Sequence, residues 1–167
     1  MIRLDLDQVE PHTPDELRTA RKIKISRVKG KGKTERMVFL SADARNALAD
    51  YLERERGRDA TSGQTALFLT ASSIAVRASD GRLSLRAFNL ILEHIGRWHD
   101  AEQRDPARHI SPLRPHDLRH TFAFQLAKVT GADVYELERR LGHRSQRYIQ
   151  RYTNPPEHIA ATYVEDF

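Results

Sequence analysis

The sequence predicts an α+β fold that is mostly helical and contains a small antiparallel sheet. Residues 22–28 and 35–40 each alternate apolar and polar side chains, as half-buried strands do. The residues between them are rich in glycine and lysine, which is typical of a tight turn. After this predicted β-hairpin, apolar residues recur at helical spacing in several segments that are bounded by capping residues, glycine or proline.

The segments outside the hairpin and the helices are less regular. Residues 2–10 alternate apolar and charged side chains up to Pro11, which indicates either a short edge strand or the end of an element that begins earlier. Residues 66–70 are apolar, and they form either a third short strand or a buried crossing segment. Residues 71–83 contain Ser, Asp and Gly and are expected to form a loop.

Most of the expected helices have a recognisable end. Ser41, Ser84 and Asp133 are good N-caps, because their side-chain oxygens accept free backbone N–H groups of the first turn. Pro115 suits the first turn of a helix, and Gly57 is expected to end the helix that follows Ser41. The expected helices span residues 42–56, 84–99, 115–129, 134–141, 145–152 and 155–164.

The composition is that of a folded domain. Hydrophobic residues make up 39% of the chain and charged residues 31%, which disfavours a disordered segment. The chain has no cysteine, so disulfides, thiolate nucleophiles and cysteine metal sites are excluded. No apolar run approaches the roughly 18 residues of a membrane helix, and the first residues lack the apolar core of a signal peptide. We therefore expect a cytoplasmic protein that does not bind a membrane.

Positive charge is concentrated near the N-terminus. The formal net charge is +5, and the segment from Leu17 to Arg36 contains one acid, Glu35. The basic residues of this segment are Arg18, Arg21, Lys22, Lys24, Arg27, Lys29, Lys31, Lys33 and Arg36. No lysine or arginine follows Tyr152. This distribution predicts a surface that tracks phosphates, with an ordinary solvated face as the alternative.

Polar residues in the C-terminal part form a pattern that suits phosphoryl transfer. His116 and Arg119 are three positions apart, so on a helix both side chains leave one face about 5 to 6 Å apart. Arginine presents a planar fork that matches phosphate oxygens, and neutral histidine accepts a proton near pH 7. His143 follows a helix-ending glycine, and Tyr152 lies one short helix later. A phenol, with a pKa of about 10, becomes a nucleophile beside such an acceptor and such cations.

A zinc site is the main alternative for the two histidines of this pattern. His116 and His120 are four positions apart with Asp117 between them, which imitates half of a helical zinc site. In such a site the positive charge of Arg119 would lie next to the metal ion and repel it, and Tyr152 would have no role. We therefore expect no metal.

Two segments resemble the C-terminal boxes of the tyrosine recombinases, the phage integrase family. They are Pro115-His116-Asp117-Leu118-Arg119-His120-Thr121-Phe122-Ala123, and Leu141-Gly142-His143 followed by Tyr152-Thr153. Residues 30–36 also resemble the β-hairpin of that family, whose lysine is Lys31 here. The resemblance implies a tyrosine-recombinase-type catalytic domain over residues 1–153, with its small sheet packed beside a helical bundle. A helical tail, packed in cis or on a neighbouring protomer, follows over residues 154–167.

The resemblance also implies a site-specific recombinase or integrase that cuts and rejoins double-stranded DNA without a cofactor. Tyr152 would attack a phosphodiester and form a 3′-phosphotyrosine with a free 5′-hydroxyl. Tyr148 has the wrong offset for that role and is expected to pack or to face DNA. Other integrase protomers are the second class of partner, with a tetramer on DNA and a monomer off it.

The remaining roles are carried over position by position. His116 would be the general base or a phosphate ligand, and Arg119 and His143 would hold the non-bridging oxygens. Lys31 would protonate the 5′-oxygen that leaves, and His120 would support the site. The residues expected to contact DNA from the hairpin are Lys29, Lys33, Arg36 and Arg27.

The sequence departs from the family pattern at its start. The family has another catalytic arginine in a helix that precedes a Leu-x-Leu-x-x-x-(Ile/Val) stretch, and residues 4–9 resemble that stretch, with Val9 one position earlier than the pattern has it. The arginine is expected before Met1, since Arg3 lies too late, and the family's DNA-clamping domain is expected there too. The alternative hypothesis is therefore a truncated, impaired integrase remnant that binds only DNA or protomers.

Overall fold

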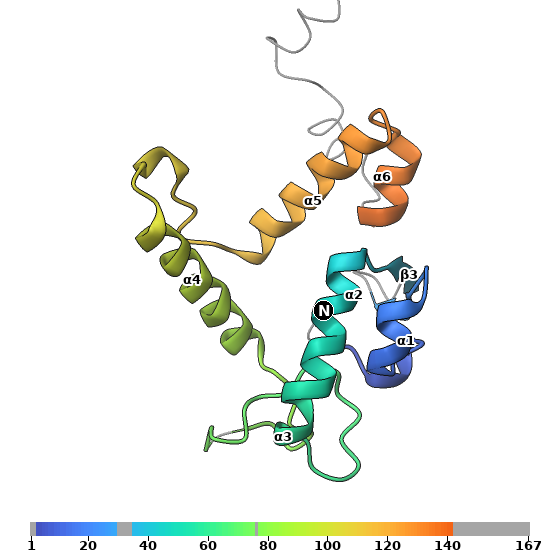
Figure 1. Cartoon of the computed structure of the whole chain (residues 1–167). Helices are drawn as coiled ribbons and strands as arrows, with labels where there is room; N and C mark the ends of the chain where they lie inside the picture. The colour runs from blue at the N-terminus through green and yellow to red at the C-terminus, as the bar shows by residue number, and fades with distance from the viewer. Residues whose placement is uncertain (1–2, 30–34, 76, 142–167) are drawn as a thin grey trace, which may run out of the picture. The chain divides into compact units, whose positions relative to one another are not determined.

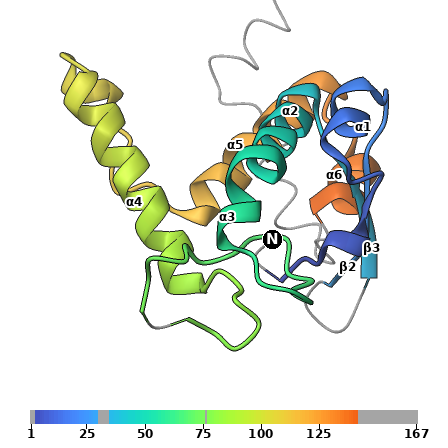
Figure 2. The same ribbon diagram turned by 60° about the horizontal axis from the view of Figure 1, so that its bottom comes forward.

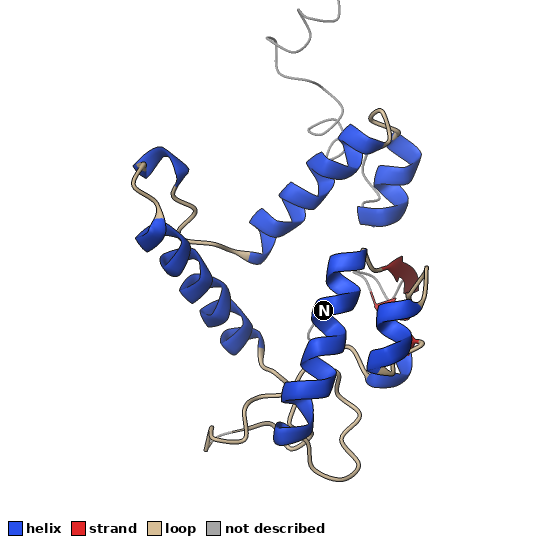
Figure 3. Cartoon of the chain, in the orientation of Figure 1, coloured by secondary structure: helices blue, strands red, loops and turns tan. Residues whose placement is uncertain are grey.

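The computed structural model describes residues 3–29, 35–75 and 77–141. Contacts within the chain divide it into two units, Met1–Pro112 and Leu113–Phe167. Helices make up most of the regular structure, and the described strands all belong to the first unit (Figure 1, Figure 3). The predicted α+β class, mostly helical with a small antiparallel sheet, is confirmed. The predicted boundary after residue 153 lies outside the described residues and stays a prediction.

The sheet has three antiparallel strands in the order β1–β2–β3. Their bounds are Val9–Glu10, Lys24–Lys29 and Glu35–Phe39. The predicted hairpin corresponds to β2 and β3, and β1 is the predicted edge strand, preceded by the 3-10 turn η1 (Leu6–Gln8). Ile23 and Ile25 are buried in the core of the first unit, which is the alternation that the sequence predicts.

Helix α1 (Pro14–Thr19) is missing from the prediction, although the sequence carries a signal for it. Thr13 Oγ1 accepts the backbone N–H of Glu16 at 3.4 Å, and Pro14 occupies the first helical position. Leu17 faces inward and is fully buried. The pattern Thr-x-x-Glu before a buried leucine therefore predicts this helix start.

Arg18 ties α1 to helix α2 (Ala42–Tyr51), and the two helices lie side by side (Figure 2). Its Nη2 donates to a carboxylate oxygen of Asp50 at 2.8 Å and of Glu53 at 2.7 Å. Arg18 belongs to the basic run near the N-terminus. These ion pairs therefore take one cation of that run into the structure of the first unit.

The helix that follows Ser41 does not end at Gly57, so this part of the prediction is wrong. Ser41 Oγ accepts the backbone N–H of Ala44 at 3.2 Å, which confirms the predicted cap. The helix then passes into the π-helical turn η2 (Leu52–Arg56) and α3 (Gly57–Asp59). Gly57 keeps helical dihedral angles, φ −62° and ψ −27°, whereas a glycine that ends a helix adopts a positive φ.

Residues 66–70 form a buried crossing segment, which is one of the two predicted alternatives. They make isolated bridges to Asp5 and Arg82 rather than a full strand. The backbone N–H of Leu69 donates to the phenol oxygen of Tyr51 at 3.0 Å, which anchors the segment to α2. The core of the first unit consists of Leu4, Val9, Leu17, Ile23, Ile25, Leu48, Ala49 and Leu67.

Helix α4 (Leu85–Glu102) extends beyond the end predicted near residue 99. Ser84 Oγ accepts the backbone N–H of Ala87 at 3.1 Å, as the capping prediction requires. The residues after position 99 contain no glycine or proline before Pro106, so nothing local stops the helix at the predicted point. The short 3-10 helix η3 (Pro106–Arg108) follows. None of the described helices combines the length and apolar character that a membrane crossing requires.

The second unit consists, among its described residues, of helices α5 (Pro115–Val129) and α6 (Val134–Leu141). Both helices have the predicted bounds. The turn between them contains Gly131 and Ala132, each with φ +61°, where glycine is the less strained choice. The core of this unit is Ala123 and Ala127 of α5 against Leu137 and Leu141 of α6. The helices expected over residues 145–152 and 155–164 lie outside the described residues.

Candidate active site

Helix α5 positions the first group of candidate residues in its opening turns. The backbone N–H of Arg114 donates to Asp117 Oδ2 at 2.8 Å, which satisfies a donor at the start of the helix. Asp117 therefore has a structural role at the N-terminus of α5. In the described part of the chain, no three histidine, aspartate or glutamate side chains gather as a metal site would require.

His116, Arg119 and His120 lie on the first two turns of α5. The His116 ring is exposed, while Arg119 and His120 are half-buried. The ring centroids of His116 and His120 are 6.5 Å apart, and the rings are tilted by 38°. The exposed histidine is thus open to a ligand, and the half-buried residues lie closer to the protein interior.

Arg119 links α5 to the C-terminal end of α6. Its Nη2 donates a hydrogen bond to the backbone carbonyl of Leu141, 22 positions later in the chain. Leu141 is the residue directly before Gly142 and His143. The fold therefore brings the arginine of the first predicted box to the start of the second.

The packing of α6 explains how Leu141 comes to lie at Arg119. Small residues on α5, Ala123 and Ala127, allow Leu137 and Leu141 to pack closely against that helix. Asp133 Oδ1 accepts the backbone N–H of Tyr135 at 2.8 Å, which confirms the predicted cap of α6.

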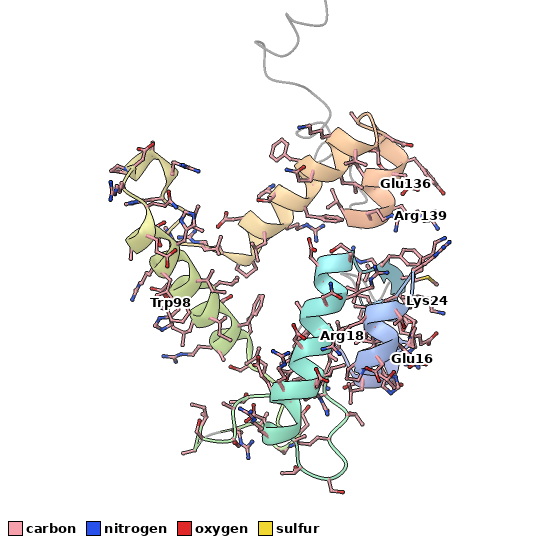
Figure 4. The ribbon with its side chains drawn as sticks, in the orientation of Figure 1. Glu16, Arg18, Lys24, Trp98, Glu136 and Arg139 are labelled. Atoms are coloured by element: carbon pink, nitrogen blue, oxygen red, sulfur yellow. The ribbon has the colours of Figure 1, made fainter. Side chains whose placement is uncertain are left out.

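The outer side of α6 carries an ion-pair cluster. Glu136 contacts Arg139 at 3.6 Å and Arg140 at 3.0 Å (Figure 4). These are exposed or partly exposed pairs of the i, i+3 and i, i+4 type, which contribute little to stability individually. They give α6 basic residues that are distinct from the candidate site.

The remaining predicted site residues belong to other segments of the chain. Lys31 and Lys33 of the hairpin turn, His143 and Tyr152 all lie outside the described residues. Their roles stay predictions. The structure brings together His116, Arg119 and His120 with the end of α6.

The predicted DNA-contacting residues of the hairpin differ in their environments. Lys29 is exposed at the end of β2, opposite Glu35 in the register. Arg36 is half-buried and lines an apolar cavity of about 550 Å³ between the sheet and α2. Arg27 Nη2 donates to Asp7 Oδ2 at 2.7 Å. Lys29 and Arg27 are thus both exposed, and Arg36 is the half-buried member of the three.

Asp100 makes polar contacts that the sequence does not predict. Its carboxylate accepts the backbone N–H groups of Ile110 at 2.7 Å and Ser111 at 3.0 Å, and it lies 3.2 Å from His99 Nδ1. It therefore closes the loop that precedes the linker to α5. Nothing in the sequence signals this contact, because the partners are ten and eleven positions away.

These contacts hold the pKa of Asp100 well below its usual range. Desolvation by itself raises that pKa, but the hydrogen bonds from Ile110, Ser111 and His99 outweigh it. A carboxyl whose pKa is depressed on folding stabilises the protein above its unfolded pKa of about 4, and this stabilisation is lost as the pH falls toward the folded pKa.

Replacing Asp100 with asparagine should therefore lower the free energy of unfolding at pH 7, because the amide is uncharged and has one acceptor oxygen where the carboxylate uses two, for Ile110 and for Ser111. The deficit relative to wild type should shrink as the pH falls below about 4. Urea denaturation at both pH values measures it. Glu102→Gln, at an exposed position of α4, is the matched control and should change stability little. A deficit that is independent of pH would contradict the role of the ionised carboxylate.

Comparison with known proteins supports the family suggested by these residues. The sequence model of the phage integrase family matches residues 15–158. Tyrosine recombinase XerC of Syntrophus aciditrophicus (strain SB) is 33% identical over 129 residues, which cover 77% of this chain and 38% of the relative. Tyrosine recombinase XerD of Mycobacterium tuberculosis (strain ATCC 25618 / H37Rv) is 34% identical over 152 residues, which cover 91% of this chain and 41% of the relative.

Solved structures share the fold. The crystal structure of XerA recombinase matches 99% of this chain and 51% of that chain, with a TM-score of 0.66 and 21% identity. XerH site-specific recombinase bound to its difH substrate, in the pre-cleavage complex, matches 98% of this chain and 40% of that chain, with a TM-score of 0.64 and 20% identity.

The chain spans about two fifths of the length of the curated relatives described above. The family match, however, extends over most of the chain and includes the α5 box, the α6 terminus and position 152. The chain therefore belongs to the phage integrase family, the tyrosine recombinases, as the resemblance of its motifs predicted.

Proposed function

We propose that this chain is the catalytic domain of a site-specific recombinase that cleaves and rejoins DNA through a 3′-phosphotyrosine. The observation that carries the proposal is the hydrogen bond from Arg119 to the Leu141 carbonyl. It joins the box of α5 to Leu141, the residue before Gly142 and His143 in the sequence, and this supports a single site built from two distant motifs. A phosphate between them would meet an arginine fork and histidines, which is the environment that a tyrosine nucleophile needs.

The reaction uses only side chains of the protein. The Tyr152 oxygen forms a bond to phosphorus, and the bond between phosphorus and the 5′-oxygen breaks. The phenol proton passes to His116 or to solvent, and Lys31 supplies the proton of the departing 5′-hydroxyl. Arg119 and His143 stabilise the charge on the non-bridging oxygens. Because the phosphotyrosine retains the energy of the phosphodiester, rejoining needs no cofactor and no metal.

Two further features belong to the proposal. His120, half-buried beside His116, supports the orientation of the site. Double-stranded DNA and other protomers are the partners, as a relative has been solved with its DNA substrate bound. The protein acts in the cytoplasm. The hairpin residues that would contact DNA are Lys29, Lys33, Arg36 and Arg27.

A second candidate function is binding to DNA or to protomers without cleavage. The resemblance places the family's first catalytic arginine in a helix ahead of the stretch that residues 4–9 resemble, and Arg3 lies too late to be that arginine. Losing one transition-state donor costs roughly a hundredfold to a thousandfold in rate. A domain without that arginine would then bind DNA and cleave it slowly.

A suicide DNA substrate that carries a nick distinguishes the two candidates. Cleavage releases a short fragment, so rejoining fails and the covalent protein–DNA adduct accumulates for detection in a denaturing gel. An adduct with the chain as given supports the active domain. An adduct only with an N-terminally extended version supports binding without efficient cleavage by this chain. No adduct with either version would overturn the proposed chemistry.

DNA binding should weaken steeply as the salt concentration rises, because contacts to phosphates release counterions. Replacing Lys29, Lys31 and Lys33 together with glutamine should flatten the plot of log affinity against log salt concentration. Each lost phosphate contact changes the slope by about 0.9. Fluorescence anisotropy of labelled DNA at several salt concentrations measures the slope.

The matched control removes three cations of the same basic run outside the turn, Arg18, Arg21 and Lys24. Arg18 is paired with Asp50 and Glu53, and Lys24 lies 2.9 Å from Glu10, so these cations have protein partners. Their replacement should change the slope less than replacement of the three lysines. Equal changes in the two triple variants would show that the hairpin turn has no special part in binding.

A further inference from the structure

Strand β2 contains a bulge close to the hairpin turn. The register passes from Ile25 opposite Val38 to Val28 opposite Arg36, so two residues of β2 stand against one residue of β3. The two residues of β2 at the bulge are Ser26 and Arg27. A bulge of this kind bends the strand and increases its twist, which redirects the part of the hairpin that lies beyond it.

The bulge requires an unfavourable backbone conformation. Arg27 has φ +52°, in the left-handed region that residues other than glycine rarely adopt. Such a conformation costs roughly 1 to 2 kcal/mol and persists where surrounding contacts impose it. Contacts that hold Ser26 and Arg27 in place are therefore part of what keeps the bulge.

Gln8 of η1 supplies these contacts. Its Nε2 donates to the backbone carbonyl of Ser26 at 3.0 Å and to that of Arg27 at 3.0 Å. Its Oε1 accepts the backbone N–H of Asp5 at 2.8 Å. Gln8 is the buried polar residue of the first unit's described part, with 9% exposure. One amide thus uses both N–H donors on the bulge and its oxygen on the N-terminal segment.

The Arg27 side chain is held by the same turn. Its Nη2 donates to Asp7 Oδ2 at 2.7 Å and to the Asp7 carbonyl at 3.3 Å. The η1 turn therefore contacts both the backbone and the side chain of the bulge. A glutamine at position 8 has no obvious substitute, because a carboxylate would face two carbonyl oxygens and an aliphatic chain would leave both unsatisfied.

We infer that Gln8 is a positioning residue for the departure of the 5′-oxygen, because it holds the bulge of β2, the strand that directly precedes Lys31 in the sequence. The bulge ends two residues before Lys29, the last residue of β2. Lys31, the proton donor of the proposed reaction, comes two positions after Lys29 in the sequence and lies outside the described residues. The inference rests on that proposed function. In it, Gln8 influences the reaction through Lys31 and does not itself contact the DNA.

The chemistry of the leaving group offers a readout that folding alone does not move. When the phosphorus–oxygen bond breaks, the 5′-oxygen needs a proton, since an alcohol is about as weak an acid as water and its alkoxide is a poor leaving group at neutral pH. A thiol has a pKa of about 8.5 and leaves as a thiolate. Cleavage of a substrate with sulfur at the 5′-bridging position therefore does not need a proton from Lys31. A variant that is impaired only in proton donation should cleave this substrate at the wild-type rate.

The test compares Gln8→Met with wild type in single-turnover cleavage of the nicked substrate, with oxygen or sulfur at the bridging position. It uses the chain or its N-terminally extended version, whichever forms the wild-type adduct. With oxygen, Gln8→Met should cleave about tenfold to a hundredfold more slowly at saturating DNA, with unchanged DNA affinity. With sulfur, its rate should come within about twofold of wild type, as that of Lys31→Ala should.

Ser26→Ala is the matched control, because it removes the longer 3.4 Å hydrogen bond from Ser26 Oγ to the Gln8 carbonyl and leaves the amide contacts intact. It should cleave both substrates at the wild-type rate. Gln8→Glu keeps the size of the side chain and should show the same oxygen-specific defect. Equal slowing of Gln8→Met on both substrates, or no slowing with oxygen, overturns the inference while the wild-type adduct preserves the proposed function. A wild-type protein that forms no adduct on either substrate overturns both.

Discussion

Replacing Tyr152 with phenylalanine should abolish the covalent protein–DNA adduct. The phenol oxygen is the atom that bonds to phosphorus in the proposed reaction, and phenylalanine has the same ring without it. Without that oxygen position 152 cannot form the bond to phosphorus, so the loss should be complete within detection. Labelled nicked DNA, resolved in a denaturing gel after incubation with each protein, measures the adduct. DNA affinity in anisotropy should stay close to that of wild type, because the ring remains.

Tyr148→Phe is the matched control, since it removes one phenol oxygen from the same segment. That residue lies at a different offset from Leu141-Gly142-His143, so its variant should form the adduct at a rate near that of wild type. The reverse pattern, an adduct with Tyr152→Phe and none with Tyr148→Phe, would reassign the nucleophile. Loss of the adduct in both variants would indicate that the reaction needs both phenol hydroxyls, so that Tyr148 also has a part in it.

The elements that the sequence predicts well are those with local signals. Alternation of side chains predicts the β2–β3 hairpin, and capping residues such as Ser84 and Asp133 mark the starts of α4 and α6. Helix α1 has an equally local signal at Thr13 and was predictable on the same grounds. The wrong end at Gly57 has a different cause. A glycine ends a helix when it adopts a positive φ, and the sequence alone does not say whether it does. Gly57 does not.

For the candidate site, too, the sequence predicts the features that depend on local spacing and not the contacts that depend on tertiary packing. The spacing of His116 and Arg119 follows from helix geometry, so the sequence alone places both on neighbouring turns. The hydrogen bond from Arg119 to Leu141 depends on how α6 packs against two alanines of α5, which is a tertiary property. The contact of Gln8 with the β2 bulge depends on pairing across 18 and 19 positions. Lys31, His143 and Tyr152 stay predictions.

Replacing Arg119 with lysine should reduce the rate of DNA cleavage roughly a hundredfold to a thousandfold. Lysine keeps the positive charge but lacks the planar fork that binds two oxygens at once. It also cannot both reach the Leu141 carbonyl in the same geometry and face a phosphate, because its three donors share one nitrogen. The loss should appear in the rate at saturating DNA, with a smaller change in affinity. Single-turnover cleavage of the nicked substrate measures both.

Part of the Arg119 effect is structural, and a second measurement separates it. Losing the donor to a partly buried carbonyl costs about 1 to 3 kcal/mol of stability, so thermal unfolding of Arg119→Lys should show a lower midpoint. Arg139→Lys is the matched control, because Arg139 is exposed on α6 and its 3.6 Å contact with Glu136 belongs to the weak surface class. It should leave both cleavage and unfolding nearly unchanged. A variant at position 119 that unfolds earlier yet cleaves at the wild-type rate would restrict Arg119 to holding α6, and the phosphate would then have to be bound by other residues.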